Sequence, residues 1–205
     1  MENLHSYNIV HRDLKPGNVL LDQNYHPKIC DFGLSKNFDM NLSSVEASPM
    51  STNSGTVLYM APEMHNGEFS HKVDVFSYSY IFYEIISGCS PQIPGCKTMY
   101  RIMDMVSKGM RPDLGKIPNK EAQLFLTKCW AQSPQERPEF YQIIQFLLQE
   151  SFFSMFGVDR SILEAYLKEC GNHYHVINSR IIKPVEAFER HVSQSSENSQ
   201  TEENT

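Results

Sequence analysis

Two motifs indicate the fold of this chain most directly: HRDLKPGN at residues 11–18 and DFG at residues 31–33. Short apolar runs predict extended strands at residues 18–21 and 28–30. The segment between them, residues 22–27, is rich in turn-forming residues and predicts a reversal of the chain. A hairpin of this kind brings the two quoted motifs to one edge of the folded chain.

Asp13, Asn18 and Asp31 are the oxygen-bearing side chains that the hairpin gathers at this edge. Carboxylate and amide oxygens, together with phosphate oxygens, are the ligands that Mg²⁺ favours. Lys15 adds a positive charge beside Asp13. Phosphoryl transfer needs metal ions on the phosphates, a base for the attacking hydroxyl group and a cation for the developing charge. The pattern therefore points to phosphoryl-transfer chemistry.

Two further motifs lie downstream, Ala61-Pro-Glu63 and a Gln-Glu-Arg-Pro run at residues 135–138. In this order and spacing, the motifs resemble the catalytic loop, the DFG motif and the APE motif of eukaryotic protein kinases. The resemblance covers about residues 1–150, and residues 151–205 lie outside it.

The resemblance implies a role for each matching residue. Asp13 matches the catalytic base, and Lys15 matches the lysine that steadies the transferred phosphate. The two Mg²⁺ ligands of the family are matched by Asn18, which is also in the catalytic loop, and by Asp31. The resemblance therefore implies ATP and Mg²⁺ as cofactors. Leu20 matches the apolar residue under the adenine ring.

The resemblance also implies a fold class and its internal supports. The fold class is mainly α, the large C-terminal lobe of a protein kinase with short β-hairpins at the catalytic cleft. Asp74 resembles a buried helix aspartate that holds the backbone of the catalytic loop. Glu63 and Arg137 resemble a buried ion pair that ties the activation segment to this lobe.

The substrate type follows from the residues around these motifs. Kinases that act on tyrosine usually carry Ala-Ala-Arg or a close variant where this chain has Lys15-Pro-Gly17, so the resemblance is to the serine/threonine type. Gly55-Thr56 ahead of the APE motif agrees with that. Cys129-Trp130, just before the Gln-Glu-Arg-Pro run, resembles the tyrosine-kinase-like group of serine/threonine kinases. The expected peptide-substrate surfaces are residues 56–61 and 97–111.

Regulation is implied by Arg12, which immediately precedes the catalytic aspartate. In the family such an arginine pairs with a phosphate on the activation loop. Ser51 and Thr52 lie nearest the expected position, and Thr56 joins them as a regulatory candidate. The expected partners are protein substrates, ATP and an upstream activating kinase.

The sequence also departs from the family pattern. No glycine-rich loop, Val-Ala-Ile-Lys strand or partner glutamate helix precedes His11, so the small β-rich lobe is absent from these residues. A fragment, a misassigned start codon and a truncated protein each fit this observation. The alternative function is a catalytically silent lobe that serves as a binding module. In the central helix, Phe76 and Ser79 stand where the family usually has tryptophan and glycine.

The amino-acid composition argues against several other classes of protein. Hydrophobic residues make up 40% of the 205 residues, which predicts a globular domain. The formal net charge of −6 argues against a nucleic-acid-binding protein. The five cysteines include no CxxC pair, which favours a reducing, cytoplasmic location over a disulfide framework. No apolar run is long enough to insert into a membrane.

Three regions are expected along the chain: a partial kinase domain at residues 1–150, a helical extension at 151–190 and a disordered acidic tail at 191–205. Apolar periodicity and Gly/Pro boundaries predict helices, and residues 37–55 are expected to form a long loop. The predicted helices span residues 71–87, 97–109, 119–131, 138–150 and 161–170.

Overall fold

The computed structural model describes residues 1–37, 56–67, 69–149 and 161. Residues 1–140 form one unit, and a second unit begins at Tyr141. The expected loop at 38–55, the helical extension and the acidic tail fall outside the described residues, apart from Ser161. The site described below lies within the first unit.

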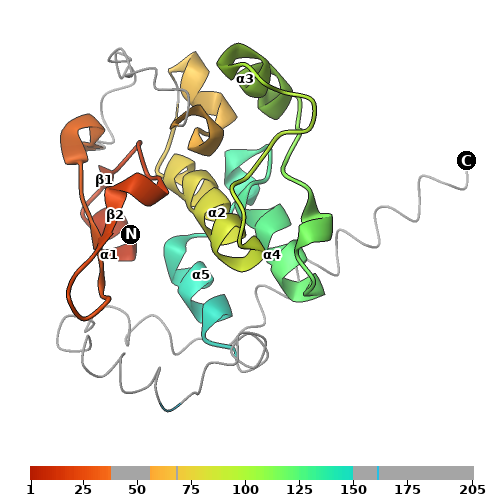
Figure 1. The fold of residues 1–205 in the computed structure, drawn as a ribbon. Coiled ribbons are helices and arrows are strands. Elements are labelled where there is room, and N and C mark those ends of the chain that lie inside the picture. Colours follow the sequence, from red (N-terminus) through yellow and green to blue (C-terminus); the bar gives the residue numbers. More distant parts are fainter. Residues whose placement is uncertain (38–55, 68, 150–160, 162–205) are drawn as a thin grey trace, which may run out of the picture. The chain divides into compact units, whose positions relative to one another are not determined.

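Helices make up most of the described residues, which confirms the mainly α fold class (Figure 1). The α-helices are α1 (Glu2–Ser6), α2 (Lys72–Ser87), α3 (Met99–Ser107), α4 (Lys120–Cys129) and α5 (Phe140–Leu147). Four of the predicted helices therefore form, each slightly shorter than predicted. Asn119 caps α4 by accepting a hydrogen bond from the backbone N–H of Ala122, and Gly88 ends α2 in a left-handed conformation.

Two small antiparallel sheets accompany the helices. Strands β2 (Val19–Leu21) and β3 (Pro27–Ile29) form the predicted hairpin, with Leu20 opposite Lys28. Strands β1 (Ile9–Val10) and β4 (Lys36–Asn37), which precede and follow the hairpin in the sequence, pair with each other, with Val10 opposite Lys36. The β1–β4 sheet was not predicted, because two-residue strands carry no readable periodicity.

Helix α2 forms the centre of the first unit, and α4 packs against it (Figure 1). Val73, Val75 and Phe76 of α2 have no exposed surface, as expected for a helix that is apolar on most sides. Phe82 of α2 meets Phe125 of α4 in an edge-to-face contact with ring centroids 5.0 Å apart. The polar residues of α2 that feature in the site are thus buried and need partners.

Short 3₁₀ turns connect these elements and carry several motif residues. They are η1 (Pro16–Asn18), η2 (Phe32–Leu34), η3 (Thr56–Tyr59), η4 (Pro62–Asn66), η5 (Leu114–Lys116) and η6 (Pro134–Glu136).

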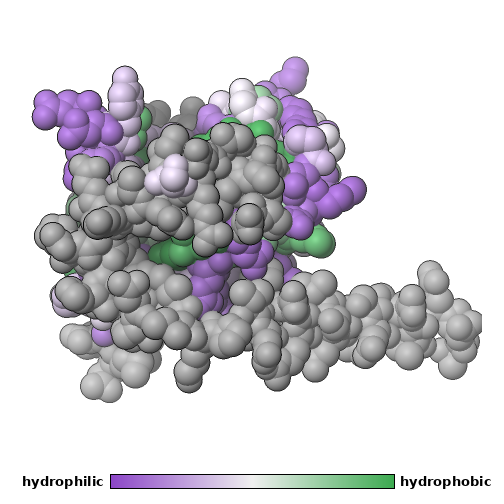
Figure 2. Space-filling model, turned by 90° about the horizontal axis from the view of Figure 1, so that it is seen from below, coloured by the Kyte–Doolittle hydropathy of each residue, from purple (hydrophilic) through white to green (hydrophobic). Residues whose placement is uncertain are grey.

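The surface of the described residues is mostly hydrophilic on the face shown in Figure 2, with hydrophobic residues confined to smaller areas. Large exposed apolar side chains nevertheless occur. Several belong to the N-terminal hairpin region, namely Leu20, Leu21, Tyr25 and Phe32. Within the described part of the chain, no helix combines the length and hydropathy needed to cross a bilayer.

Candidate active site

Asp74 fixes the backbone of the HRD stretch to helix α2. Its carboxylate is fully buried, and it accepts hydrogen bonds of 2.9 Å from the backbone N–H groups of both His11 and Arg12. His5 of α1 donates a third bond to it, with Nε2 2.8 Å from Oδ2. A buried carboxylate is tolerated only when donors surround it, as here. Sequence reasoning identified Asp74 but missed His5, which lies 69 residues away along the chain.

Replacing Asp74 by asparagine is expected to lower the free energy of unfolding by about 2 kcal/mol. The NH₂ group of the asparagine side chain is a donor, so it would face a buried N–H donor that then has no acceptor. Hydrogen exchange at the amides of His11 and Arg12 should accelerate. Asp104→Asn is the matched control, since Asp104 of α3 makes an exposed pair with Lys108, just after the helix, that contributes little. Unchanged exchange at the two amides would contradict this role for Asp74.

His11 joins the HRD stretch to the DFG segment. The backbone N–H of Asp13 donates to Nδ1 of His11, at 3.3 Å, so this nitrogen is the acceptor. Nε2 therefore carries the proton and donates to the backbone carbonyl of Cys30, at 3.0 Å. The His11 ring also contacts Phe32, with centroids 5.1 Å apart. This connecting role of His11 was not predicted from the sequence.

The carboxylate of Asp13 is held on one side and unpartnered on the other. Oδ2 accepts hydrogen bonds from Lys15 Nζ, at 2.7 Å, and from Asn18 Nδ2, at 3.1 Å. Oδ1 is buried and has no hydrogen-bond partner among the described residues. Only 8% of the Asp13 surface is exposed, so the unpartnered oxygen is a costly feature unless it has a ligand.

Asn18 and Asp31 lie at the same end of the β2–β3 hairpin. The backbone N–H of Cys30 donates to the Asn18 carbonyl, at 2.9 Å, which places the two segments side by side. Asn18 Nδ2 also donates to the Asp13 carbonyl oxygen, at 2.7 Å, so its Oδ1 is the atom suited to metal ligation. Asp31 is exposed and has left-handed backbone angles, with φ 63°. An amide oxygen and a carboxylate together form a donor set that fits Mg²⁺.

Leu20, the predicted adenine contact, lies on β2 with 55% of its surface exposed. Phe32 is 41% exposed. Apolar side chains are therefore accessible at the same hairpin that carries Asn18 and precedes Asp31, as a site for a planar apolar ring requires.

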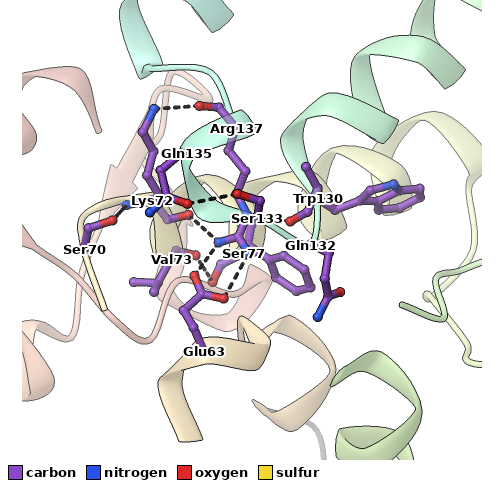
Figure 3. A network of polar contacts seen from close by, with 12 residues as sticks. Glu63, Ser70, Lys72, Val73, Ser77, Trp130, Gln132, Ser133, Gln135 and Arg137 are labelled. Atoms are coloured by element: carbon purple, nitrogen blue, oxygen red, sulfur yellow. Dashed lines mark hydrogen bonds and ion pairs between the residues drawn. The ribbon is translucent and has the colours of Figure 1, made fainter. Parts of the chain in front are cut away.

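Glu63 and Arg137, 74 residues apart, form the ion pair shown in Figure 3. Both guanidinium Nη atoms contact the carboxylate, and Nη2 lies 2.9 Å from Oε2. Arg137 also donates to the carbonyls of Ala131, at 2.9 Å, and Lys72, at 3.1 Å. Its Cζ lies 4.9 Å from the centroid of the Phe76 ring. The arginine thus joins η4, the start of α2 and the segment after α4.

The sequence profile of protein tyrosine and serine/threonine kinases matches residues 1–147. The chain belongs to this protein kinase family. Similar proteins include serine/threonine-protein kinase STY17 of Arabidopsis thaliana, which is 35% identical over 150 residues, covering 73% of this chain and 25% of the relative. Receptor-interacting serine/threonine-protein kinase 2 of Bos taurus is 38% identical over 154 residues, covering 69% of this chain and 28% of the relative.

The kinase relatives are much longer than the matched region. For a third relative, RGS domain-containing serine/threonine-protein kinase A of Dictyostelium discoideum, 38% identity extends over 72% of this chain but only 12% of the relative. The chain therefore spans about a quarter or less of the length of most of these kinases. Members of the family use ATP and Mg²⁺.

The two expected substrate surfaces of the kinase lie next to each other. Helix α3, within residues 97–111, contacts η3, within residues 56–61. Tyr59 of η3 is anchored to α2 through its carbonyl, which accepts from Ser77 Oγ at 2.7 Å, and through its hydroxyl, which donates to Glu84 at 2.9 Å. Of the regulatory candidates, Ser51 and Thr52 lie outside the described residues, and Thr56 begins η3.

A second ion-pair cluster, also missed from the sequence, supports the Arg137 anchor. Lys72 Nζ donates to the Arg137 carbonyl and contacts Glu139, both at 2.6 Å. His71 Nε2 lies 2.8 Å from the other Glu139 oxygen. Partial burial raises the pKa of Glu139, but the hydrogen bonds from His71 and Lys72 outweigh burial and lower it from 4.5 to about 2.

This low pKa predicts a pH dependence. Between pH 4.5 and 2 the unfolded chain binds a proton at Glu139 that the folded chain does not, so the contribution of Glu139 to stability is lost as the pH falls. Glu139→Gln should therefore show a smaller fall in the free energy of unfolding than the unmodified chain over this interval, measured by urea denaturation. Parallel curves for the two proteins would contradict the prediction. Glu136→Gln, at an exposed position, is the matched control.

Proposed function

We propose that residues 1–150 are the large lobe of a serine/threonine protein kinase that transfers the γ-phosphoryl group of ATP to protein hydroxyl groups. The observation that carries the proposal is the Asp13 carboxylate. Lys15 and Asn18 hold one of its oxygens, and the other is buried without a partner among the described residues. An oriented carboxylate with one available oxygen is what a base for a substrate hydroxyl group requires.

The remaining groups have complementary roles in this proposal. Asp13 Oδ1 accepts the hydroxyl proton of the substrate, while Asp74 keeps the surrounding backbone fixed. Lys15 places its ammonium group beside the reacting atoms. Asn18 Oδ1 and the Asp31 carboxylate would hold Mg²⁺, which supplies charge neutralisation of the phosphates when bound. Leu20 would contact the adenine ring.

The type of substrate and the location belong to the same proposal. Lys15-Pro-Gly17 and the serine/threonine kinases among the relatives support hydroxyl groups of serine and threonine as acceptors. The free state of Cys30, Cys89, Cys96 and Cys129 supports a reducing, cytoplasmic location. Membership of the kinase family supports ATP and protein substrates as partners.

Nucleotide binding gives the first test on the full 205-residue chain. Mg²⁺ with ATP is expected to raise the free energy of unfolding, by about 2.7 kcal/mol at a hundredfold excess over the dissociation constant. Asp31→Asn should remove the Mg²⁺-dependent part of this gain, while Asp22→Asn, in the turn of the same hairpin, should retain it. No stabilisation by the nucleotide would contradict the proposal and favour the alternative of a silent binding module.

A further inference from the structure

Arg111, a few residues after helix α3, donates hydrogen bonds to two separate parts of the chain. Its Nη1 donates to the carbonyls of Val106 and Met110, at 2.9 Å and 2.8 Å, at the end of α3 and shortly after it. Its Nε donates to the Trp130 carbonyl, at 2.9 Å, and its Nη2 donates to Gln132 Oε1, at 2.8 Å. The planar, rigid guanidinium can serve several acceptors at once. Arg111 therefore joins the end of α3 to the segment that follows α4.

Arg137 binds the same segment as Arg111. Its Nε donates to the Ala131 carbonyl, at 2.9 Å, which lies between the two residues that Arg111 contacts. Both guanidiniums also contact the ring of Phe76, whose centroid is 5.1 Å from Arg111 Cζ and 4.9 Å from Arg137 Cζ. Figure 3 shows residues of this segment next to the Glu63–Arg137 ion pair. The ion pair and the Arg111 contacts thus share one support.

Gln132 forms a second link between this segment and α3. Its Oε1 accepts from Arg111, and its Nε2 donates to the carbonyl of Ser107, the last residue of α3, at 2.9 Å. The last carbonyls of a helix have no partner within the helix, and a cation near them is favourable for the helix dipole. Arg111 and Gln132 therefore hold this end of α3 in a defined place.

Helix α3 contacts both η3 and η4. Of these two turns, η4 carries Glu63, which is fixed to the segment after α4 through Arg137. Loss of Arg111 would loosen α3 but leave η4 attached through Arg137. The position of α3 relative to η3, and so of one expected substrate surface relative to the other, depends on Arg111.

We propose that Arg111 is a positioning residue for the binding of protein substrates, because it fixes α3 against η3. The link to substrates rests on the proposed kinase function. A binding surface that is held in place beforehand loses less conformational entropy when its ligand binds. Loss of Arg111 should therefore weaken substrate binding and leave the transfer step at Asp13 unchanged.

The experiment uses the full chain with dephosphorylated casein, a flexible protein that carries many serine hydroxyl groups. Fluorescence anisotropy of labelled casein gives its dissociation constant without any need for catalysis. Hydrogen exchange is followed at the N–H of Met60, which donates to the Val57 carbonyl of η3. The matched control for Arg111→Met is Lys108→Met, which removes an exposed cation just after α3.

Arg111→Met should weaken casein binding by about three- to tenfold, the effect of having to order a loosened surface on binding. Exchange at the Met60 amide should accelerate, because η3 loses its fixed contact with α3. Arg111→Lys should fail to restore either property, since an ammonium group lacks the planar fork. Lys108→Met should change neither. Unchanged casein affinity or unchanged Met60 exchange in Arg111→Met, or full activity of Arg111→Lys in both measurements, would overturn the proposal.

If circular dichroism shows that Arg111→Met does not fold, Gln132→Ala takes its place, because Gln132 is exposed and its truncation leaves the core intact. This variant should weaken casein binding by about twofold, and an unchanged affinity would overturn the proposal. The transfer rate at saturating casein should equal that of the unmodified chain.

The binding and transfer measurements separate this proposal from the kinase function. A chain that shows the expected changes in binding and exchange but transfers no phosphate loses the proposed kinase function and keeps the role of Arg111. Normal transfer with equal casein affinity in every variant has the opposite meaning. No binding of casein by the unmodified chain would also overturn the role of Arg111 in substrate binding.

Discussion

Arg137→Met is expected to lower the free energy of unfolding by about 3–5 kcal/mol, the usual cost of removing one partner from a buried ion pair. Arg137 is only 1% exposed, and its loss leaves the Glu63 carboxylate and the carbonyls of Ala131 and Lys72 without their donor. Because whole domains are stable by about 5–15 kcal/mol, this single change removes a large part of the total. Urea denaturation measures this loss of stability, and the free energy of unfolding should fall with urea concentration at the same slope in both proteins.

Arg101→Met is the matched control, since Arg101 lies exposed on α3, and it should change stability by less than about 0.5 kcal/mol. Glu63→Gln with Arg137→Met should cost less than the sum of the two single changes, because the double variant leaves no unpaired charge at this pair. A loss below about 1 kcal/mol for Arg137→Met would mean that the pair behaves like an exposed surface ion pair.

Asp13→Asn is expected to lower the rate of phosphoryl transfer by about 10²- to 10⁴-fold, the contribution of a positioned general base. The fold should persist, because an asparagine oxygen can occupy the position that Lys15 and Asn18 contact. Its amide nitrogen would then occupy the position of the unpartnered Oδ1, where it can donate but cannot take a proton.

The measurement follows transfer of radiolabelled phosphate from ATP to serine, threonine and tyrosine peptides by the full chain. Asp22→Asn is the control, because Asp22 accepts hydrogen bonds from the Asn24 and His26 backbones within the turn of the hairpin. Equal rates for Asp13→Asn and Asp22→Asn would refute the role of Asp13. Transfer mainly to tyrosine would refute the serine/threonine assignment.

Local patterns were sufficient to predict the elements that form the scaffold. The β2–β3 hairpin forms at Val19–Leu21 and Pro27–Ile29 because apolar residues flank a turn-rich segment. Helix α2 is buried because it is apolar on most sides. The ordered motifs also led to the protein kinase family, which the profile match shows. Each of these conclusions depends on residue types and their spacing along the chain, and none needs a contact between distant segments.

Contacts between distant segments were predicted only where the family resemblance supplied them, as for Glu63 and Arg137. Three other contacts were not predicted from the sequence. They are the hydrogen bond of His5 to Asp74, the bonds of His11 to Asp13 and Cys30, and the ion pair of Lys72 with Glu139. The sequence by itself determined most of the local elements and the family, and it supplied the candidate side chains for the proposed chemistry. Only the tertiary structure decided which oxygen of Asp13 is left available and what holds Arg12 in place. The reason is physical. Lys15 and Asn18 select one Asp13 oxygen through the orientation of their side chains, which the residue types alone do not specify. Asp74 reaches Arg12 from 62 residues away, and the two meet only when α2 and its neighbours pack.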